Sequence, residues 1–173
     1  MIAQERVVGR LSAAALRKRW RQMADDRLLR AIPYKLELNE KGSVEVSPAT
    51  PRHALLQSLI ATELRGLLSA GSTFVECPIE TEIGVRVADV AWASRDFLAG
   101  RALDEPFERA PELCIEVLSP SNTRAEIDEK IRAYLAAGAR EVWLVGESGA
   151  IEIIGPEGAR LLSELGITLT LPR

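Results

Sequence analysis

The 173 residues, 47% of them hydrophobic and 27% charged, have the length and composition of one globular domain that buries a core without disulfides or a structural metal. No apolar run approaches the roughly 20 residues that span a bilayer, and arginines interrupt the N-terminus where a signal peptide would be apolar. A membrane or secreted protein is therefore not expected, and a cytoplasmic one is. The net charge of −3 also gives no support for broad electrostatic binding of DNA.

The N-terminal segment, residues 1–32, is expected to form a basic helical arm. Residues 1–35 contain nine Lys or Arg against three Asp or Glu, a net charge of +6, which leaves −9 for residues 36–173. Residues 11–30 have helix formers and a rough apolar stripe, which predicts a helix ended by Pro33. The arm could contact phosphate, but a solvated helix is the favoured alternative.

A hairpin and a helix are predicted next. The runs YKLEL (34–38) and SVEVS (43–47) alternate in polarity and are joined by NEKG, which is typical of a β-hairpin. Thr50 as N-cap and Pro51 at the first helical position begin a helix that extends to about residue 69.

The second half of the chain alternates strands and a helix. Strands are predicted over 73–77, 81–94, 111–119, 141–147 and 150–155. Residues 95–110 are predicted to be a polar loop that could contain a short helix, and residues 123–137 to be a helix. Thr123 and Glu126 form a capping box at the start of that helix, and Gly138 closes it. The tail, LLSELGITLTLP, is expected to add one more strand.

The order of these elements predicts an α/β fold with a mixed central sheet flanked by helices. The strands 111–119 and 141–147 would be parallel and joined by the helix between them. Cys77 and Cys114 both lie in apolar, strand-like runs, so buried reduced thiols are expected and a zinc site is not.

Two acidic residues interrupt apolar strands. Asp89 lies in VRVADVAWA (85–93) and Glu116 in ELCIEVLS (112–119). A carboxylate buried without partners costs several kcal/mol or changes its protonation state, so two of them on neighbouring strands need a cation between them. Mg²⁺ suits such a site because it accepts one or two carboxylates and keeps several waters. The alternative is pairing with an arginine, such as Arg86 or Arg140.

Lys130 lies on the helix that follows the Glu116 strand. At 100° per residue it falls about 60° from Ile127, at the border of the apolar stripe and beside Tyr134. A lysine there can hold its ammonium near the two carboxylates and assist the attacking water or offset charge on a phosphate. The equally weighted alternative is an exposed i, i+4 pair with Glu126 or Tyr134.

Other catalytic centres have less support. The single histidine, His53, lies in the first turn of the helix from 51, where a packed, hydrogen-bonded histidine is favoured over a metal ligand. No G-x-S-x-G elbow, Walker loop or dinucleotide fingerprint occurs.

The runs EVLSPSNTRAEIDEKIRAYLAAGAREVWLV (116–145) and LELNEKGSVEVSPATPRH (36–53) resemble the Uma-two family of restriction endonucleases, within the PD-(D/E)XK nuclease superfamily. The resemblance covers about residues 34–155 and implies a restriction-endonuclease-like core over 33–173. The residue before the motif's aspartate is usually proline, and this chain has Ala88 there.

The resemblance also assigns roles. It implies that Asp89 and Glu116 bind Mg²⁺, or Mn²⁺ as a substitute, with the Val117 carbonyl as a further ligand, and that Lys130 replaces the superfamily's usual lysine two residues after the second acid. Glu37 and His53 match two further family positions, and Tyr134 beside Lys130 is an additional candidate.

The expected function is metal-dependent hydrolysis of DNA phosphodiester bonds, with a homodimer as a plausible assembly for cutting two strands. Two alternatives remain open. One is a non-catalytic nucleic-acid-binding or dimerisation module that keeps the fold, which the acidic body favours. The other is a hydrolase of a different phosphoester.

Overall fold

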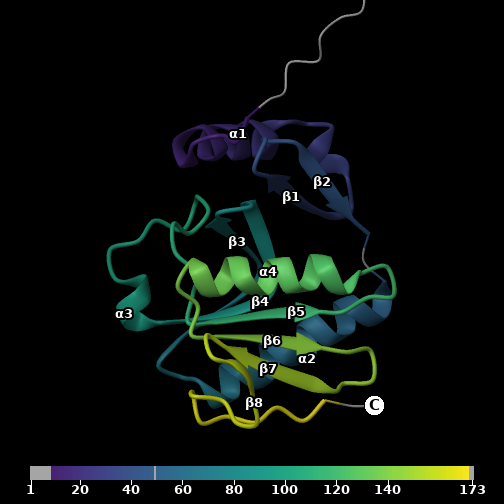
Figure 1. Cartoon of the computed structure of the whole chain (residues 1–173), viewed down its shortest axis with the longest axis vertical. Helices are drawn as coiled ribbons and strands as arrows, with labels where there is room; N and C mark the ends of the chain where they lie inside the picture. The colour runs from purple at the N-terminus through teal and green to yellow at the C-terminus, as the bar shows by residue number, and fades with distance from the viewer. Residues whose placement is uncertain (1–8, 49, 172–173) are drawn as a thin grey trace, which may run out of the picture.

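Eight strands form one mixed, mostly antiparallel sheet in the computed structural model, which describes residues 9–48 and 50–171 (Figure 1). Only β5 and β6 run parallel among the strand pairs of this part of the chain, and α4 connects them. The strands are β1 Lys35–Asn39, β2 Val44–Ser47, β3 Gly71–Thr81, β4 Gly84–Ser94, β5 Leu113–Val117, β6 Glu141–Val145, β7 Ile151–Gly155 and β8 Gly158–Arg160. The helices are α1 Ala13–Asp25, the 3₁₀ turn Leu29–Ala31, α2 Pro51–Leu67, α3 Arg95–Leu98 and α4 Arg124–Ala136.

The central strand β4 has two different neighbours on one of its edges. Strand β3 pairs with β4 along its whole length on the other edge. On the shared edge, β1 pairs with β4 at residues 84–85 and β5 pairs with it at residues 90–92. Residues 86–89 of β4, called here the half-paired stretch, therefore lie between the ends of β1 and β5. On this edge, the backbone groups of the half-paired stretch have no neighbouring strand and need other partners.

Gly84 is required where β1 meets β4. Its φ is +119°, a conformation that favours glycine, and a Cβ at this position would lie 2.0 Å from the carbonyl oxygen of Leu38. This close approach places β1, and the side chains that it carries, against the half-paired stretch.

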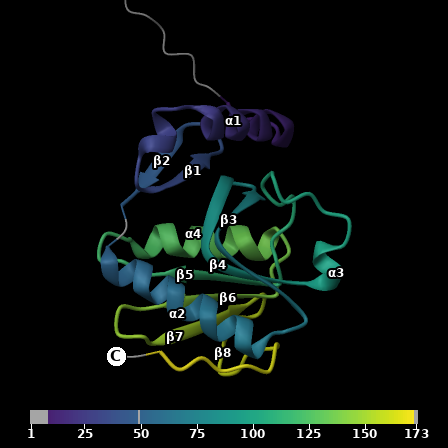
Figure 2. The same ribbon diagram turned by 180° about the vertical axis from the view of Figure 1, so that it is seen from behind.

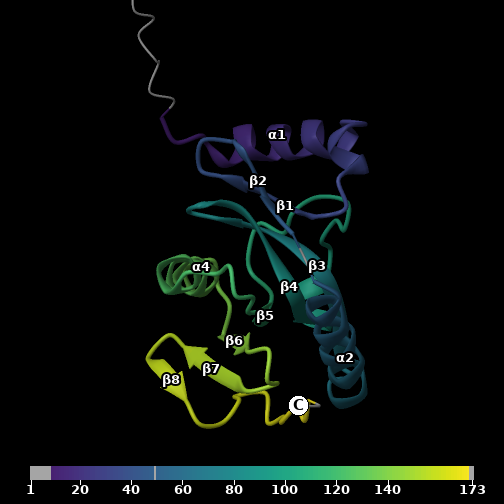
Figure 3. The same ribbon diagram turned by 90° about the vertical axis from the view of Figure 1, so that its right-hand side faces the viewer.

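Two helices cover opposite faces of the sheet (Figure 3). The α2 helix packs Leu56, Ile60 and Leu64 on one core cluster, which includes Ile115 and Trp143. The α4 helix packs on the other face (Figures 1 and 2). Its contacts are Ile127, Ile131 and Tyr134 against Cys114 and Leu144.

The N-terminal helix α1 packs on the sheet. Leu16 and Met23 share a small core with Leu38 of β1 and Val85 of β4. Arg17 pairs with Glu80 and Glu108, and Arg21 pairs with Glu105, so part of the basic charge is used within the molecule. Residues 1–8 of the predicted arm lie outside the described residues, and the boundary at residue 32 stays a prediction.

Most of the predicted elements are confirmed. The hairpin, α2, the capping box at Thr123 and the parallel β5–β6 pair are present, and Cys77 and Cys114 are free and buried. Across the described part of the chain, none of the helices is both long and apolar enough to cross a bilayer.

Three expectations about secondary structure are wrong. The predicted helix 11–30 ends at Asp25, where Asp26 accepts backbone N–H groups in a turn. The predicted strand 73–77 lengthens to Gly71–Thr81, because Pro78 stays paired within β3, and the predicted strand 81–94 begins only at Gly84, so that the two form a hairpin of 11-residue strands. The tail forms no strand up to residue 171. Its alternating apolar side chains, including Leu169 and Leu171, instead pack on the core beneath α2. These side chains are therefore buried as they would be in a strand, but over the described residues the backbone pairs with no other strand.

Candidate functional site

A cleft with a volume of about 960 Å³ opens at the half-paired stretch. The start of β1, the end of β2, the first turn of α2, the end of β5 and the first turns of α4 all contribute to its wall. Among its lining residues are Lys35, Glu37, Glu45, His53, Glu76, Arg86, Asp89, Glu116, Val117, Ser119, Asn122 and Lys130.

Three buried acids, Glu37, Asp89 and Glu116, meet in this cleft and are called the carboxylate cluster below. They come from β1, β4 and β5. Asp89 Oδ2 accepts the backbone N–H of Val117 at 2.7 Å, and Glu37 Oε1 accepts that of Val87 at 2.8 Å. The acids therefore supply acceptors that the missing strand would otherwise provide, which fixes their orientation.

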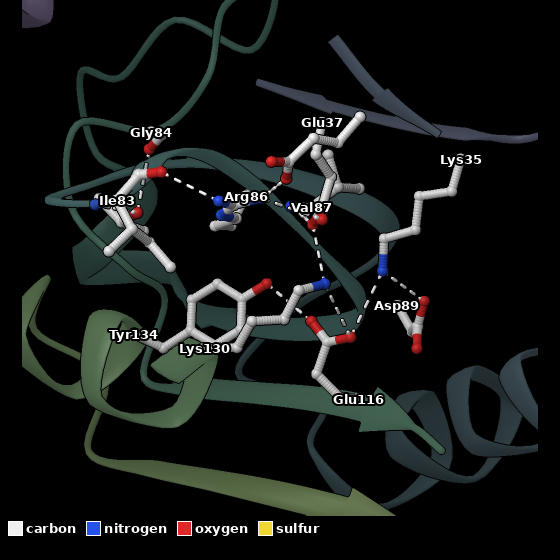
Figure 4. A network of polar contacts seen from close by, with 12 residues as sticks. Lys35, Glu37, Ile83, Gly84, Arg86, Val87, Asp89, Glu116, Lys130 and Tyr134 are labelled. Carbon is white, nitrogen blue, oxygen red and sulfur yellow. Dashed lines mark hydrogen bonds and ion pairs between the residues drawn. The ribbon is translucent and has the colours of Figure 1, made fainter. Parts of the chain in front are cut away.

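Two lysines contact the carboxylate cluster and offset part of its negative charge (Figure 4). Lys35 Nζ, from the start of β1, lies 2.7 Å from Asp89 Oδ1 and 3.4 Å from Glu116 Oε2. Lys130 Nζ, from α4, lies 2.9 Å from Glu37 Oε1 and 3.5 Å from Glu116 Oε2. Glu116 is thus shared by both ammonium groups, whereas Lys35 alone links Asp89 to Glu116.

Tyr134 fixes the other oxygen of Glu116. Its hydroxyl donates to Glu116 Oε1 at 2.7 Å, and the side chain has 0% exposure. Tyr134 and Lys130 are four residues apart on α4, so both point to the same acid from one helix face. Burial and the Glu116 charge raise the pKa of Tyr134 well above its usual value, which keeps the phenol a donor.

Asp89 is held from α2 as well. His53 Nε2 lies 3.3 Å from Asp89 Oδ1, and the Gln57 amide donates to the same oxygen at 3.2 Å. These two residues are four apart on the helix and face the strand together. The Gln57 amide also donates to Glu76 at 2.6 Å; Glu76 is opposite Asp89 in the β3–β4 register and has a φ of +53°.

Arg86 pairs with Glu37 and Glu45, and not with the two acids for which an arginine was the alternative partner. Glu37 and Glu45 lie opposite one another across the β1–β2 ladder, where like charges are destabilising. The Arg86 guanidinium contacts both and relieves that repulsion.

The three acids differ in their tendency to ionise. Burial opposes ionisation of Asp89, but Lys35 and His53 outweigh it and hold its pKa well below the usual range. Burial raises the pKa of Glu116, and the two lysines offset this only in part. Another cation nearby would therefore favour the charged form of Glu116.

The pKa values of Lys35, His53 and Glu37 follow the charges around them. Burial opposes the charge on Lys35, but Glu116 and Asp89 together raise its pKa. The hydrogen bond to Asp89 raises the pKa of His53. For Glu37, Lys130 and Lys35 outweigh the effect of burial and lower its pKa.

The structure brings the three predicted catalytic residues, Asp89, Glu116 and Lys130, into one cleft, and the candidates Glu37, His53 and Tyr134 contact the same cluster. The roles given to them stay predictions. Sequence reasoning missed Lys35 and Gln57, although period-two spacing puts Lys35 beside Glu37, and i, i+4 spacing puts Gln57 beside His53.

The donor set fits a hard divalent cation. Among residues 9–48 and 50–171, no three or more His, Cys, Asp or Glu side chains are grouped so as to hold a metal ion. Asp89 and Glu116 do converge on one cation position, and the Lys35 ammonium stands there. Mg²⁺ is commonly held by one or two carboxylates in addition to waters, so Asp89 and Glu116, with the nearby backbone of Val117, are the residues that would hold such an ion.

Tyr134→Phe should lower the free energy of unfolding by about 2 kcal/mol, because it removes a hydrogen bond to a buried charged group. Urea denaturation measures the change. Tyr34→Phe, at an exposed ring, is the matched control and should leave the stability unchanged. Equal stability of Tyr134→Phe and the wild type would contradict the role of the hydroxyl.

Two comparisons with known proteins returned matches. A family model named Uma2 and described as "Putative restriction endonuclease" matches residues 25–169. A solved structure, described as a "putative nuclease belonging to DUF820 from Anabaena variabilis", superposes with a TM-score of 0.63 at 19% identity, over 79% of this chain and 81% of that one. No curated protein matches the chain.

At 19% identity the solved structure shows a shared fold, which agrees with the mixed sheet and flanking helices described above. The family match spans most of the chain and includes the half-paired stretch, the carboxylate cluster and both lysines. The chain therefore belongs to the Uma2 family of restriction-endonuclease-like proteins.

Proposed function

We propose that this protein is a metal-dependent endonuclease that hydrolyses DNA phosphodiester bonds. The observation that carries the proposal is the convergence of two buried carboxylates from adjacent strands, Asp89 and Glu116, with the Lys130 amine in one open cleft. Buried acids with perturbed pKa values in a cleft are typical of functional sites. The family match and the solved structure with a similar fold, both described as nucleases, also support this proposal.

Asp89 and Glu116 would hold Mg²⁺, or Mn²⁺ in its place, with the Val117 carbonyl as a further ligand. When bound, the ion would polarise the phosphodiester and lower the pKa of a coordinated water. The excess of acids in the cleft supports this proposal, because a phosphate would be repelled from such a cleft unless a cation entered with it.

The protein's own residues would orient the reaction. Lys130, held by Glu37 at 2.9 Å, lies at the edge of the carboxylate cluster, where it would position the attacking water or offset charge on the phosphate. Tyr134 would fix Glu116, and His53 with Gln57 would fix Asp89. A homodimer would supply two such sites, one for each strand of a duplex.

The test is nicking of supercoiled plasmid by the wild-type protein with Mg²⁺, with Mn²⁺ and with EDTA. Conversion to the open-circular form is expected with either ion, and none is expected with EDTA. Equal nicking in EDTA would exclude metal-dependent hydrolysis, and absence of nicking under all conditions would exclude an endonuclease that cuts duplex DNA without regard to its sequence.

One observation favours the second candidate, a non-catalytic nucleic-acid-binding or dimerisation module. Lys35 already places a positive charge on both Asp89 and Glu116, as it would in a fold that no longer binds a metal there. A gel-shift experiment in EDTA separates the two. Binding of DNA without metal and without any nicking on adding Mg²⁺ would support the module.

A further inference from the structure

We propose that Lys35 is a tethered cation that occupies the metal position, so that its ammonium and a divalent ion compete for Asp89 and Glu116. The inference rests on the proposed function, because it concerns the same metal site. It adds a residue that controls how readily the site accepts its ion.

The geometry distinguishes Lys35 from Lys130. Lys35 Nζ contacts a carboxylate oxygen on each of the two proposed ligands, at 2.7 and 3.4 Å. Lys130 Nζ contacts Glu37 and Glu116 and stands to one side of Asp89 (Figure 4). An ion that binds Asp89 and Glu116 together would therefore meet the Lys35 ammonium first.

Charge balance gives the direction of the effect. With both lysines in place, three carboxylates face two ammonium groups. Without Lys35, Glu37 keeps its contacts to Lys130 and Arg86, whereas Asp89 keeps only the contact to His53 among its charged partners, in a buried place with low screening. A divalent cation would supply the missing positive charge, so its affinity should rise when Lys35 loses its charge.

The position of Lys35 also allows the exchange. It is the first residue of β1, and its side chain is 9% exposed at the wall of a cleft that opens to solvent. Tyr34, the residue before it, is exposed and lines the same cleft, so a displaced ammonium would have solvent beside it. Lys35 would then be free to meet the phosphate that enters with the ion.

The test is isothermal titration of Mg²⁺ and Mn²⁺ into the wild type, Lys35→Met and the control Lys41→Met, whose exposed lysine lies in the β1–β2 turn. Methionine keeps the length of the side chain and removes the charge. Lys35→Met should bind at least about tenfold more tightly than the wild type, and Lys41→Met should match the wild type.

Each outcome separates the inference from the proposed function. Tighter binding by Lys35→Met supports the inference, and it does so even if the wild type binds no metal, in which case the proposed function of the wild type fails. Equal or weaker binding by Lys35→Met overturns the inference and leaves the proposed function standing. No binding by either protein overturns both.

A second variant and a second measurement test the inference if Lys35→Met does not fold. Lys35→Gln keeps a polar side chain at the cleft, and the melting temperature of each variant is measured in EDTA and in excess Mg²⁺. The metal-induced rise should be larger for Lys35→Gln than for the wild type. An equal or smaller rise would contradict competition at this position.

Discussion

Asp89→Asn is expected to abolish metal binding and to lower the rate of cleavage by at least about a thousandfold. Asp89 Oδ2 accepts the N–H of Val117, and Oδ1 accepts from Lys35 and from Gln57. An asparagine offers one acceptor oxygen and one amide nitrogen, so one of these donors would face another donor. The substitution therefore removes the charge of a proposed metal ligand and breaks one of the hydrogen bonds that orient its side chain.

The same argument predicts a loss of stability. Removing one partner of a buried ion pair costs about 3 kcal/mol, because the lysine is left without its closest partner. Titration of Mg²⁺, plasmid nicking and urea denaturation measure the three effects. Asp104→Asn, in the exposed loop before β5, is the control. If Asp89→Asn bound Mg²⁺ with the affinity of the wild type, Asp89 would not be a metal ligand.

The sequence identifies Asp89 and Glu116 as candidate site residues because each interrupts an apolar, alternating run. The same criterion alone would also select Glu141, which is fully buried at the start of β6. Its carboxylate accepts the Ser163 hydroxyl and the Glu164 N–H, so it holds the C-terminal segment in place. A buried acid thus becomes a candidate site only when its neighbours in space are other charges at a cleft.

The rest of the cluster depends on one tertiary contact that local patterns do not contain. β1 joins β4 next to β5, and only this arrangement brings Lys35 and Glu37 to Glu116, residues about 80 positions away. Alternation predicts that Lys35 and Glu37 share a face of the hairpin. It does not say which strand of the sheet that hairpin will pair with.

Arg86 and Glu76 show a related limit. Pairing of the strand acids with Arg86 was the alternative to a cation site, and Arg86 pairs instead with Glu37 and Glu45, which face each other across the hairpin. Glu76 reaches the site because it is opposite Asp89 in the β3–β4 register. Register and strand order decide both contacts, and each is set by the whole sheet.

Lys130→Met should leave metal binding intact and lower the rate of cleavage by about a hundredfold to a thousandfold. Lys130 contacts Glu37 and Glu116 but not Asp89, so the position between the two proposed ligands is preserved. What is lost is the one amine that α4 directs into the cleft, where it would act on water or phosphate. Stability should fall by about 3 kcal/mol, since Glu37 loses its closest cation.

Metal titration and plasmid nicking on the same preparation separate these effects, with Lys18→Met on the exposed side of α1 as the control. Cleavage at the wild-type rate would show that Lys130 has no catalytic role. Loss of metal binding together with cleavage would show that it only positions Glu116. The expected pattern is the opposite of that for Lys35→Met, where the affinity for the ion changes, and the two lysines on either side of Glu116 are thereby assigned different functions.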